Sequence, residues 1–133
     1  MYIYKKKMPQ VSIIFAAIAA AIHVLFFAME SIFFMNPKVY KGFGVRSNED
    51  AELLKVSMFN QGFYNLFLAI GIFEGIYLLR DYTLAGKSLI LFCCASMVAA
   101  AVVLLFSKKG MMRGVLLQGL CPLIAIVCYL CIH

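Results

Sequence analysis

Charged residues are scarce in this 133-residue chain, at 14% of the total, whereas an average soluble domain carries about 25%. Tryptophan is absent, proline occurs only three times, and Asp and Glu together number six against 12 Lys and Arg. Apolar residues fill the difference and reach 65%. A soluble enzyme, a disordered chain and a disulfide-stapled secreted domain each require a different composition. The composition therefore predicts a small polytopic membrane protein.

The motifs of several common enzyme classes are missing as well. The sequence has no Ser-His-Asp order and no glycine-rich phosphate loop, so hydrolysis and phosphoryl transfer are not predicted. All five cysteines lie in apolar runs, and an odd number there argues against a disulfide framework. Cys128-x-x-Cys131 followed by His133 superficially resembles a metal motif, but a structural zinc site usually has a second ligand pair. We interpret these cysteines as small apolar side chains, and we predict no metal and no cofactor.

Four apolar runs are long enough to cross a bilayer, which takes about 20 residues. They cover residues 11–35, 58–79, 84–107 and 111–132. In lipid only helices and closed barrels pair all their backbone groups, and the alternation typical of barrel strands is absent. The first run is too long for the apolar region of a signal peptide. The sequence thus predicts one all-α domain over residues 1–133, an antiparallel transmembrane four-helix bundle with short loops.

Local signals place the ends of the helices. Asn36-Pro37 is expected to stop the first helix, because the residue before proline avoids the helical region. Ser47 followed by Asp50 resembles a capping box, so the second helix is expected to begin near Asn48, before its apolar run.

Basic residues flank the four runs, as in ordinary membrane proteins, and nucleic acid is not a predicted partner. Seven Lys and Arg lie on the side of the first and third loops, and five lie on the side of the amino terminus and the second loop. The first helix often dominates orientation, however, and the cluster Lys5–Lys7 precedes it. We predict a cytoplasmic-membrane protein with both termini in the cytoplasm.

The polar residues inside the runs are the informative ones, because an ionisable group in a span usually faces the bundle interior. His23 lies in the middle of the first run, and Glu30 follows two helical turns later on the same face, about 10 Å away. Residues four apart lie on the same face of a helix. Gln61 and Asn65 therefore share one face of the second run, and so do Asn60 and Tyr64. With Gln118 of the fourth run, these groups fall in one half of the membrane, and His23 is expected to form the floor.

Two interpretations of this cluster stay open. Interhelical hydrogen bonds act as modest glue in membrane proteins, worth about 0.6 kcal/mol each on average, and the cluster would then be purely structural. Six or seven polar groups in so short a chain favour a polar cavity instead. A carboxyl, an imidazole, several amides and a phenol suit ligand binding or proton exchange. Glu74, in Gly71-x-x-x-Gly75, is interpreted as an interfacial carboxylate on a helix that closely approaches a neighbour.

Three sequence blocks carry a family resemblance. They are His23-x6-Glu30, Asn60-Gln61-Gly62-x-Tyr64-Asn65 and Gln118-Gly119-x-x-Pro122. In these blocks the chain resembles an uncharacterised family of small bacterial four-helix membrane proteins, labelled only as a domain of unknown function. The resemblance implies four spans, no established activity, and a functional site made of the motif residues. They are His23, Glu30, Asn60, Gln61, Tyr64, Asn65 and Gln118.

The leading hypothesis is a membrane protein that binds a small amphiphilic or lipid-like molecule through those seven residues. Glu30 would be the charge or proton partner and His23 the proton donor or acceptor at the midplane. Three alternatives remain: an isomerase that uses Glu30 and His23 as acid and base, a proton or small-cation transporter, and a structural subunit. The isomerase alternative rests on a resemblance of this chain to four-helix sterol isomerases at the level of fold only. The predicted partners are membrane lipid, the amphiphile and, optionally, a second copy of the chain.

Overall fold

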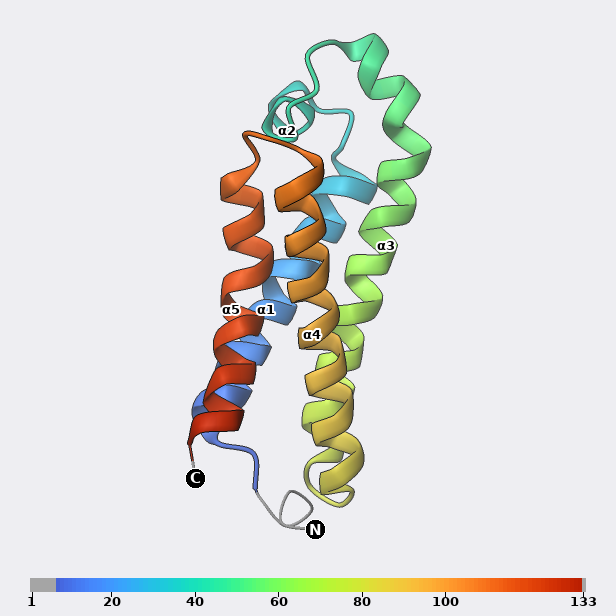
Figure 1. Cartoon of the computed structure of the whole chain (residues 1–133). Coiled ribbons are helices and arrows are strands. Elements are labelled where there is room, and N and C mark those ends of the chain that lie inside the picture. Colours follow the sequence, from blue (N-terminus) through green and yellow to red (C-terminus); the bar gives the residue numbers. More distant parts are fainter. Residues whose placement is uncertain (1–6, 133) are drawn as a thin grey trace.

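The computed structural model describes residues 7–132 and folds them entirely into helices and connecting turns, as predicted. Figure 1 shows four long helices side by side with one short helix across one end of the bundle. The elements in chain order are α1 (Gln10–Phe27), the π-helical turn η2 (Ala28–Ile32), α2 (Pro37–Gly42), α3 (Asn48–Leu78), α4 (Thr83–Ser107) and α5 (Met112–Cys131).

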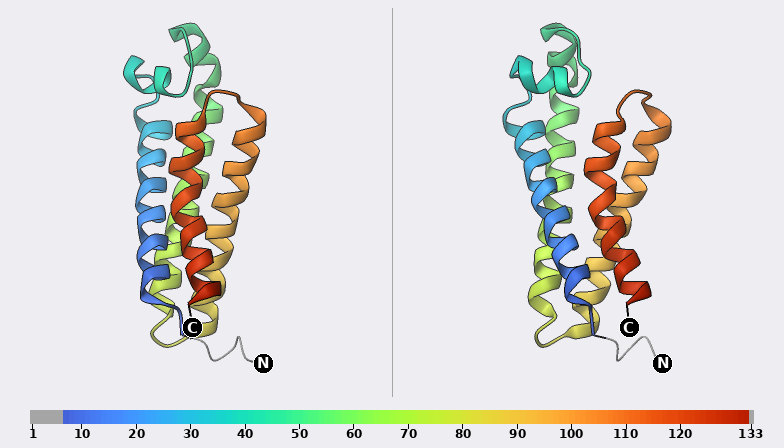
Figure 2. Two further views of the ribbon diagram at one scale, coloured as in Figure 1. Left: turned by 60° about the vertical axis from the view of Figure 1, so that its left-hand side comes forward. Right: turned by 90° about the vertical axis from the view of Figure 1, so that its left-hand side faces the viewer.

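The four long helices form a square, up-and-down bundle in which consecutive helices are antiparallel. α1 packs against α3 and α5, and α4 packs against the same two helices, whereas the α1–α4 diagonal touches at few points. The start of α1 and the end of α5 lie at the same end of the bundle (Figures 1 and 2). All four are long and apolar enough to cross a membrane: Gln10–Ile32, Asn48–Leu78, Thr83–Ser107 and Met112–Cys131. The predicted transmembrane four-helix bundle is therefore confirmed as a fold class.

The first span ends earlier than predicted. The Phe33 amide donates to the Ala28 carbonyl five residues back at 2.9 Å, which makes the last turn a π turn, and Phe33 then leaves the helical region. Asn36-Pro37 does not stop this helix but starts the next one. The Asn36 side chain accepts a hydrogen bond from the Lys38 amide at 2.9 Å, and Pro37 occupies the first turn of α2. Proline is favoured there because its missing N–H has no partner to lose.

The start of α3 agrees with the sequence. The Ser47 hydroxyl accepts a hydrogen bond from the Asp50 amide at 3.1 Å, and the helix begins at Asn48. With 31 residues, α3 is about 46 Å long, so it exceeds a hydrocarbon core of about 30 Å. Its first turns extend past α4 and α5 and meet α2 (Figure 1). Tyr40, Val45 and Ala51 are buried in the small core between these segments.

The main core lies towards the end of the bundle where α1 begins and α5 ends. It consists largely of alanines from α1 with larger side chains from α3 and α4, including Ile72, Ile90 and Met97. At this end α3 and α4 are in close contact. A Cβ on Gly75 would lie 2.7 Å from Ile90 Cγ1 and 3.0 Å from the Gly86 carbonyl oxygen, so only glycine fits there. Towards the α2 end, α3 diverges from α4 (Figures 1 and 2).

Candidate functional site

A cavity of about 260 Å³ lies inside the bundle near its α2 end. We call this space the inner cavity. All four long helices and the segment after α2 contribute to its wall. The polar lining residues are Glu30, Gln61, Asn65, Lys108 and Gln118, and the rest are Phe26, Phe43, Val45, Leu54, Met58, Leu104, Met111 and Gly114. The structure therefore brings four of the seven predicted site residues together around one space.

Glu30 is the buried acid of this cavity, with only 4% of its surface exposed. It lies in the π-helical turn η2, and such turns occur frequently at functional sites. The Asn65 side-chain amide of α3 donates a hydrogen bond to Glu30 Oε2 at 2.7 Å. Asn65 is itself 8% exposed, so the pair links the end of the first span to the middle of α3 away from bulk water.

A glycine in the Asn-Gln-Gly-x-Tyr-Asn block makes this link possible. A Cβ on Gly62 would overlap Ser31 Oγ and would lie 3.1 Å from the Glu30 Cβ, so any larger residue would push α3 away from η2. Ser31 strengthens the same contact, because its hydroxyl donates to the Phe59 carbonyl of α3 at 2.8 Å. Close approach at Gly62 lets the short side chain of Asn65 reach the Glu30 carboxyl.

Gln61 and Gln118 supply amides to the inner cavity from α3 and α5. Neither side chain has a hydrogen-bond partner within residues 7–132, and Gln61 is exposed while Gln118 is half-buried. A primary amide offers two donors and one acceptor oxygen. These two residues thus present unused hydrogen-bonding groups to the cavity, whereas Asn65 has committed one of its donors to Glu30.

Asn60 and Tyr64 do not join the cluster, contrary to the expectation based on depth. Tyr64 is 66% exposed, Asn60 is exposed, and neither lines the inner cavity. Successive residues of a helix are turned by about 100°, so Gln61 and Asn65 can face inward only if Asn60 and Tyr64 face another side. Depth in the membrane fixed how far along α3 these residues lie but not which way they point.

His23 is fully buried, yet it does not form the floor of the cavity. Its Nδ1 lies 2.8 Å from the Ala19 carbonyl oxygen, and Nε2 has no hydrogen-bond partner within the described residues. Phe26 lines the cavity instead and meets the imidazole edge-on, with 5.6 Å between the ring centroids. The imidazole is therefore not among the residues that line the cavity with Glu30.

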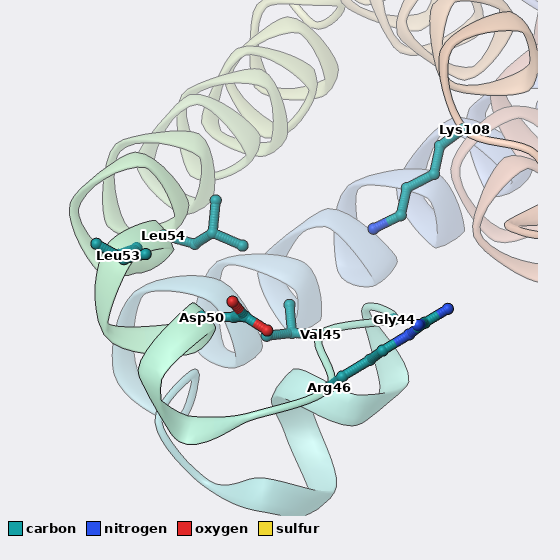
Figure 3. Close-up of a pocket in the computed structure, with 7 residues that line it drawn as sticks. All are labelled: Gly44, Val45, Arg46, Asp50, Leu53, Leu54 and Lys108. Carbon is teal, nitrogen blue, oxygen red and sulfur yellow. The ribbon is translucent and has the colours of Figure 1, made fainter.

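A second pocket of about 370 Å³, the outer pocket, adjoins the inner cavity at its mouth. Figure 3 shows the Lys108 side chain reaching into this pocket from the end of α4. Its lining residues are Gly44, Val45, Arg46, Asp50, Leu53, Leu54 and Lys108. The two spaces share the wall residues Val45, Leu54 and Lys108, so they lie next to each other. Sequence reasoning missed Arg46 and Lys108 because it used them only as markers of orientation.

Polar residues towards the other end of the bundle are organised differently. Glu74 is exposed, while Lys87, which the sequence placed beside a loop, is only 2% exposed within α4. The buried Ser12 hydroxyl donates to the Ala125 carbonyl at 2.6 Å. Residues 7–132 contain no group of three or more metal-ligating side chains and no disulfide. Lys5, Lys6 and His133 lie outside the described residues.

Searches among curated proteins and among solved structures found no match to this chain. A comparison with protein families found one, described as "Protein of unknown function (DUF1304)", which covers residues 17–130. The match includes α3 and α4 in full, most of α1 and α5, the inner cavity and every residue of the predicted site. The chain therefore belongs to this uncharacterised family, as its sequence blocks had indicated.

Proposed function

We propose that this multi-pass membrane protein binds a small amphiphilic or lipid-like molecule in the inner cavity. The observation that carries the proposal is the space itself: about 260 Å³ beside Glu30, with the free amides of Gln61 and Gln118 around it. Most of the lining residues belong to helices that are long and apolar enough to span a membrane, which favours a partly apolar ligand that enters from the lipid.

The shape of the cluster favours binding over simple glue. Glue needs polar groups that bond one another, as Asn65 and Glu30 do at 2.7 Å. Gln61 and Gln118 have no such partners within the described residues, although apolar side chains would pack there at lower cost. Ligand sites typically measure about 300–1,000 Å³, so the inner cavity alone suits a compact polar group. The outer pocket extends it for the rest of the molecule.

The geometry gives each residue a distinct role in this proposal. Glu30 is the charge or proton partner of the ligand, and Asn65 holds its carboxyl in place through Oε2. The second carboxyl oxygen remains available to the ligand. Gln61 and Gln118 orient the bound group from different helices, and Phe26 contributes an aromatic ring to the wall.

The rival activities fit these contacts less well. An acid–base isomerase needs two groups at the substrate, but His23 is not among the residues that line the cavity. A transporter needs a polar route to the other face, where the packed core of Ile72, Ile90 and Met97 occupies the bundle interior. The cytoplasmic-membrane location, the cytoplasmic termini and a homo-oligomer stay predictions.

A thermal-shift experiment tests the proposal directly. The full chain, purified in a mild detergent, is titrated with short-chain lipids of different headgroups. We expect at least one lipid to raise the melting temperature of the parent protein, and the double variant Glu30→Gln/Gln118→Leu to lose that rise. Asn60→Leu, which changes an amide outside the cavity, is the matched control and should keep it. An absent response in the parent protein, or an equal response in all three proteins, would contradict the proposal.

A further inference from the structure

The wall shared by the two spaces carries cations that form no ion pair within residues 7–132. Lys108 lines both the inner cavity and the outer pocket, and Arg46 lines the outer pocket. Asp50 is the single acid in that wall, and no ion pair forms between it and either cation. The outer pocket therefore has a formal excess of one positive charge, and Lys109 and Arg113 add to it at the same end of the bundle.

The Lys108 side chain is held by one hydrogen bond and keeps free hydrogen-bond donors. Its ammonium group donates one hydrogen bond, to the Phe43 carbonyl at 2.7 Å. An ammonium has three N–H donors, so two remain for another acceptor. The contact with Phe43, 65 residues away in sequence, fixes the side chain across the mouth, as its position in Figure 3 illustrates.

Arg46 adds a second donor set to the same wall. Its guanidinium has five N–H donors and makes no hydrogen bond or ion pair within residues 7–132. Guanidinium and ammonium groups together are the usual partners of phosphate oxygens. Their position beside the outer pocket, rather than on a convex surface, gives a phosphate a place to lie.

The groups deeper in the site select a different part of the ligand. Side-chain amides both donate and accept hydrogen bonds, and a carboxyl group accepts them or, when protonated, also donates one. A hydroxyl group likewise donates and accepts hydrogen bonds. Gln61, Gln118 and Glu30 therefore match a hydroxylated group that reaches past the phosphate. Leu53 and Leu54 of α3 line the outer pocket with exposed apolar surface, 83% and 42% respectively, on which an apolar part of the ligand can lie.

We infer that the ligand is a phosphate ester with a hydroxylated headgroup, whose phosphate binds Lys108 and Arg46 and whose hydroxyls bind the inner amides. This inference rests on the proposed function and names the ligand class. The same chemistry exists in an anionic phospholipid and in a free polyol phosphate. The exposed leucines and the membrane-spanning helices favour the lipid.

The experiment compares three probes on the purified full chain in detergent: dihexanoyl-phosphatidylglycerol, dihexanoyl-phosphatidylcholine and glycerol 3-phosphate. Both lipids carry the phosphate, but only the glycerol headgroup has hydroxyls for the inner amides, and the choline headgroup adds a cation beside Lys108 and Arg46. We therefore expect the phosphatidylglycerol to bind on the order of tenfold more tightly than the phosphatidylcholine. Equal binding of the two lipids would overturn the inference but leave the proposed function intact. Failure of all three probes to bind would end both. Tighter binding of glycerol 3-phosphate than of either lipid would keep the phosphate site and refute the lipid source.

Neighbouring lysines provide a matched pair of variants. Lys108→Gln removes the cation of the pocket, while Lys109→Gln removes the same charge from the next residue, which is exposed and lines neither space. We expect Lys108→Gln, but not Lys109→Gln, to weaken phosphatidylglycerol binding about tenfold. Lys108→Arg should restore most of it, which excludes a folding defect. Equal losses in the two glutamine variants would mean attraction by surface charge only and would overturn the site.

Discussion

Asn65→Leu tests the contact on which the candidate site is built. The substitution keeps a side chain of similar size but removes the only hydrogen bond that Glu30 receives from the described residues. Glu30 is 4% exposed, so bulk water does not simply replace the lost donor. The buried carboxyl is then left to whatever water the inner cavity admits.

The expected cost follows from that burial. A buried polar group that loses its partner costs about 1–3 kcal/mol in soluble proteins, and side-chain hydrogen bonds in a membrane protein average about 0.6 kcal/mol. Because the Glu30 carboxyl faces a cavity rather than packed side chains, we expect a loss of about 1–2 kcal/mol in the free energy of unfolding. In Glu30→Leu/Asn65→Leu, where no polar group is left unpaired, most of the loss should disappear.

Reversible unfolding in mixed detergent micelles measures these differences, and the four proteins of the cycle give the coupling energy between Glu30 and Asn65. Asn60→Leu is the control, because it changes the same residue type on the same helix at a position outside the cavity. We expect that control to leave stability unchanged or to raise it slightly. Equal costs at positions 60 and 65, or a coupling energy near zero, would refute the reasoning from the Glu30–Asn65 contact.

The remaining predictions concern the helix contacts and the buried imidazole. Gly75→Ala should destabilise the bundle, because its Cβ would lie 2.7 Å from Ile90 Cγ1 and 3.0 Å from the backbone of Gly86. Gly114→Ala is the control and should be tolerated, because its nearest contact would be at 3.4 Å. Thermal unfolding compares the two variants, and equal melting temperatures would count against a tight α3–α4 crossing. Gly62→Ala should lower both stability and ligand affinity, and Ser31→Gly should partly reverse both effects by removing the overlapping hydroxyl; no reversal would mean that Ser31 is not the obstacle. His23→Leu should raise the free energy of unfolding by about 1 kcal/mol, because Nε2 has no partner within the described residues, and should leave ligand affinity in a titration unchanged; a loss of affinity would return His23 to the site.

Much of the fold was predictable because it depends on one-dimensional properties of the sequence. Uninterrupted apolar runs fix how many helices can cross a membrane, and the Ser47 cap fixes where α3 begins. The π turn was not predictable. It arises from a single change of backbone partner at Phe33, and no residue type in that segment signals it.

The candidate site was predictable in depth but not in direction. Counting residues along each run correctly grouped Glu30, Gln61, Asn65 and Gln118, since the rise per residue is constant. The same count also admitted Tyr64, which points outward, because the rotation of α3 about its axis depends on packing against η2. Lys108 joins the site through a contact 65 residues distant, which no local pattern contains.

The cavity is best understood as the counterpart of the close packing at the other end of the bundle. At Gly75 and Gly86 the backbones of α3 and α4 touch, and a Cβ on Gly86 would lie 2.6 Å from the Gly75 carbonyl oxygen. From this contact the two helices separate towards the other end of the bundle, as Figures 1 and 2 show. At the open end, the Gly62 contact and the Asn65–Glu30 hydrogen bond hold α3 against η2 instead of against α4. The space between α3, α4 and α5 then stays open because α3 is already committed on its other side, so the polar pair that lines the cavity also keeps it from closing.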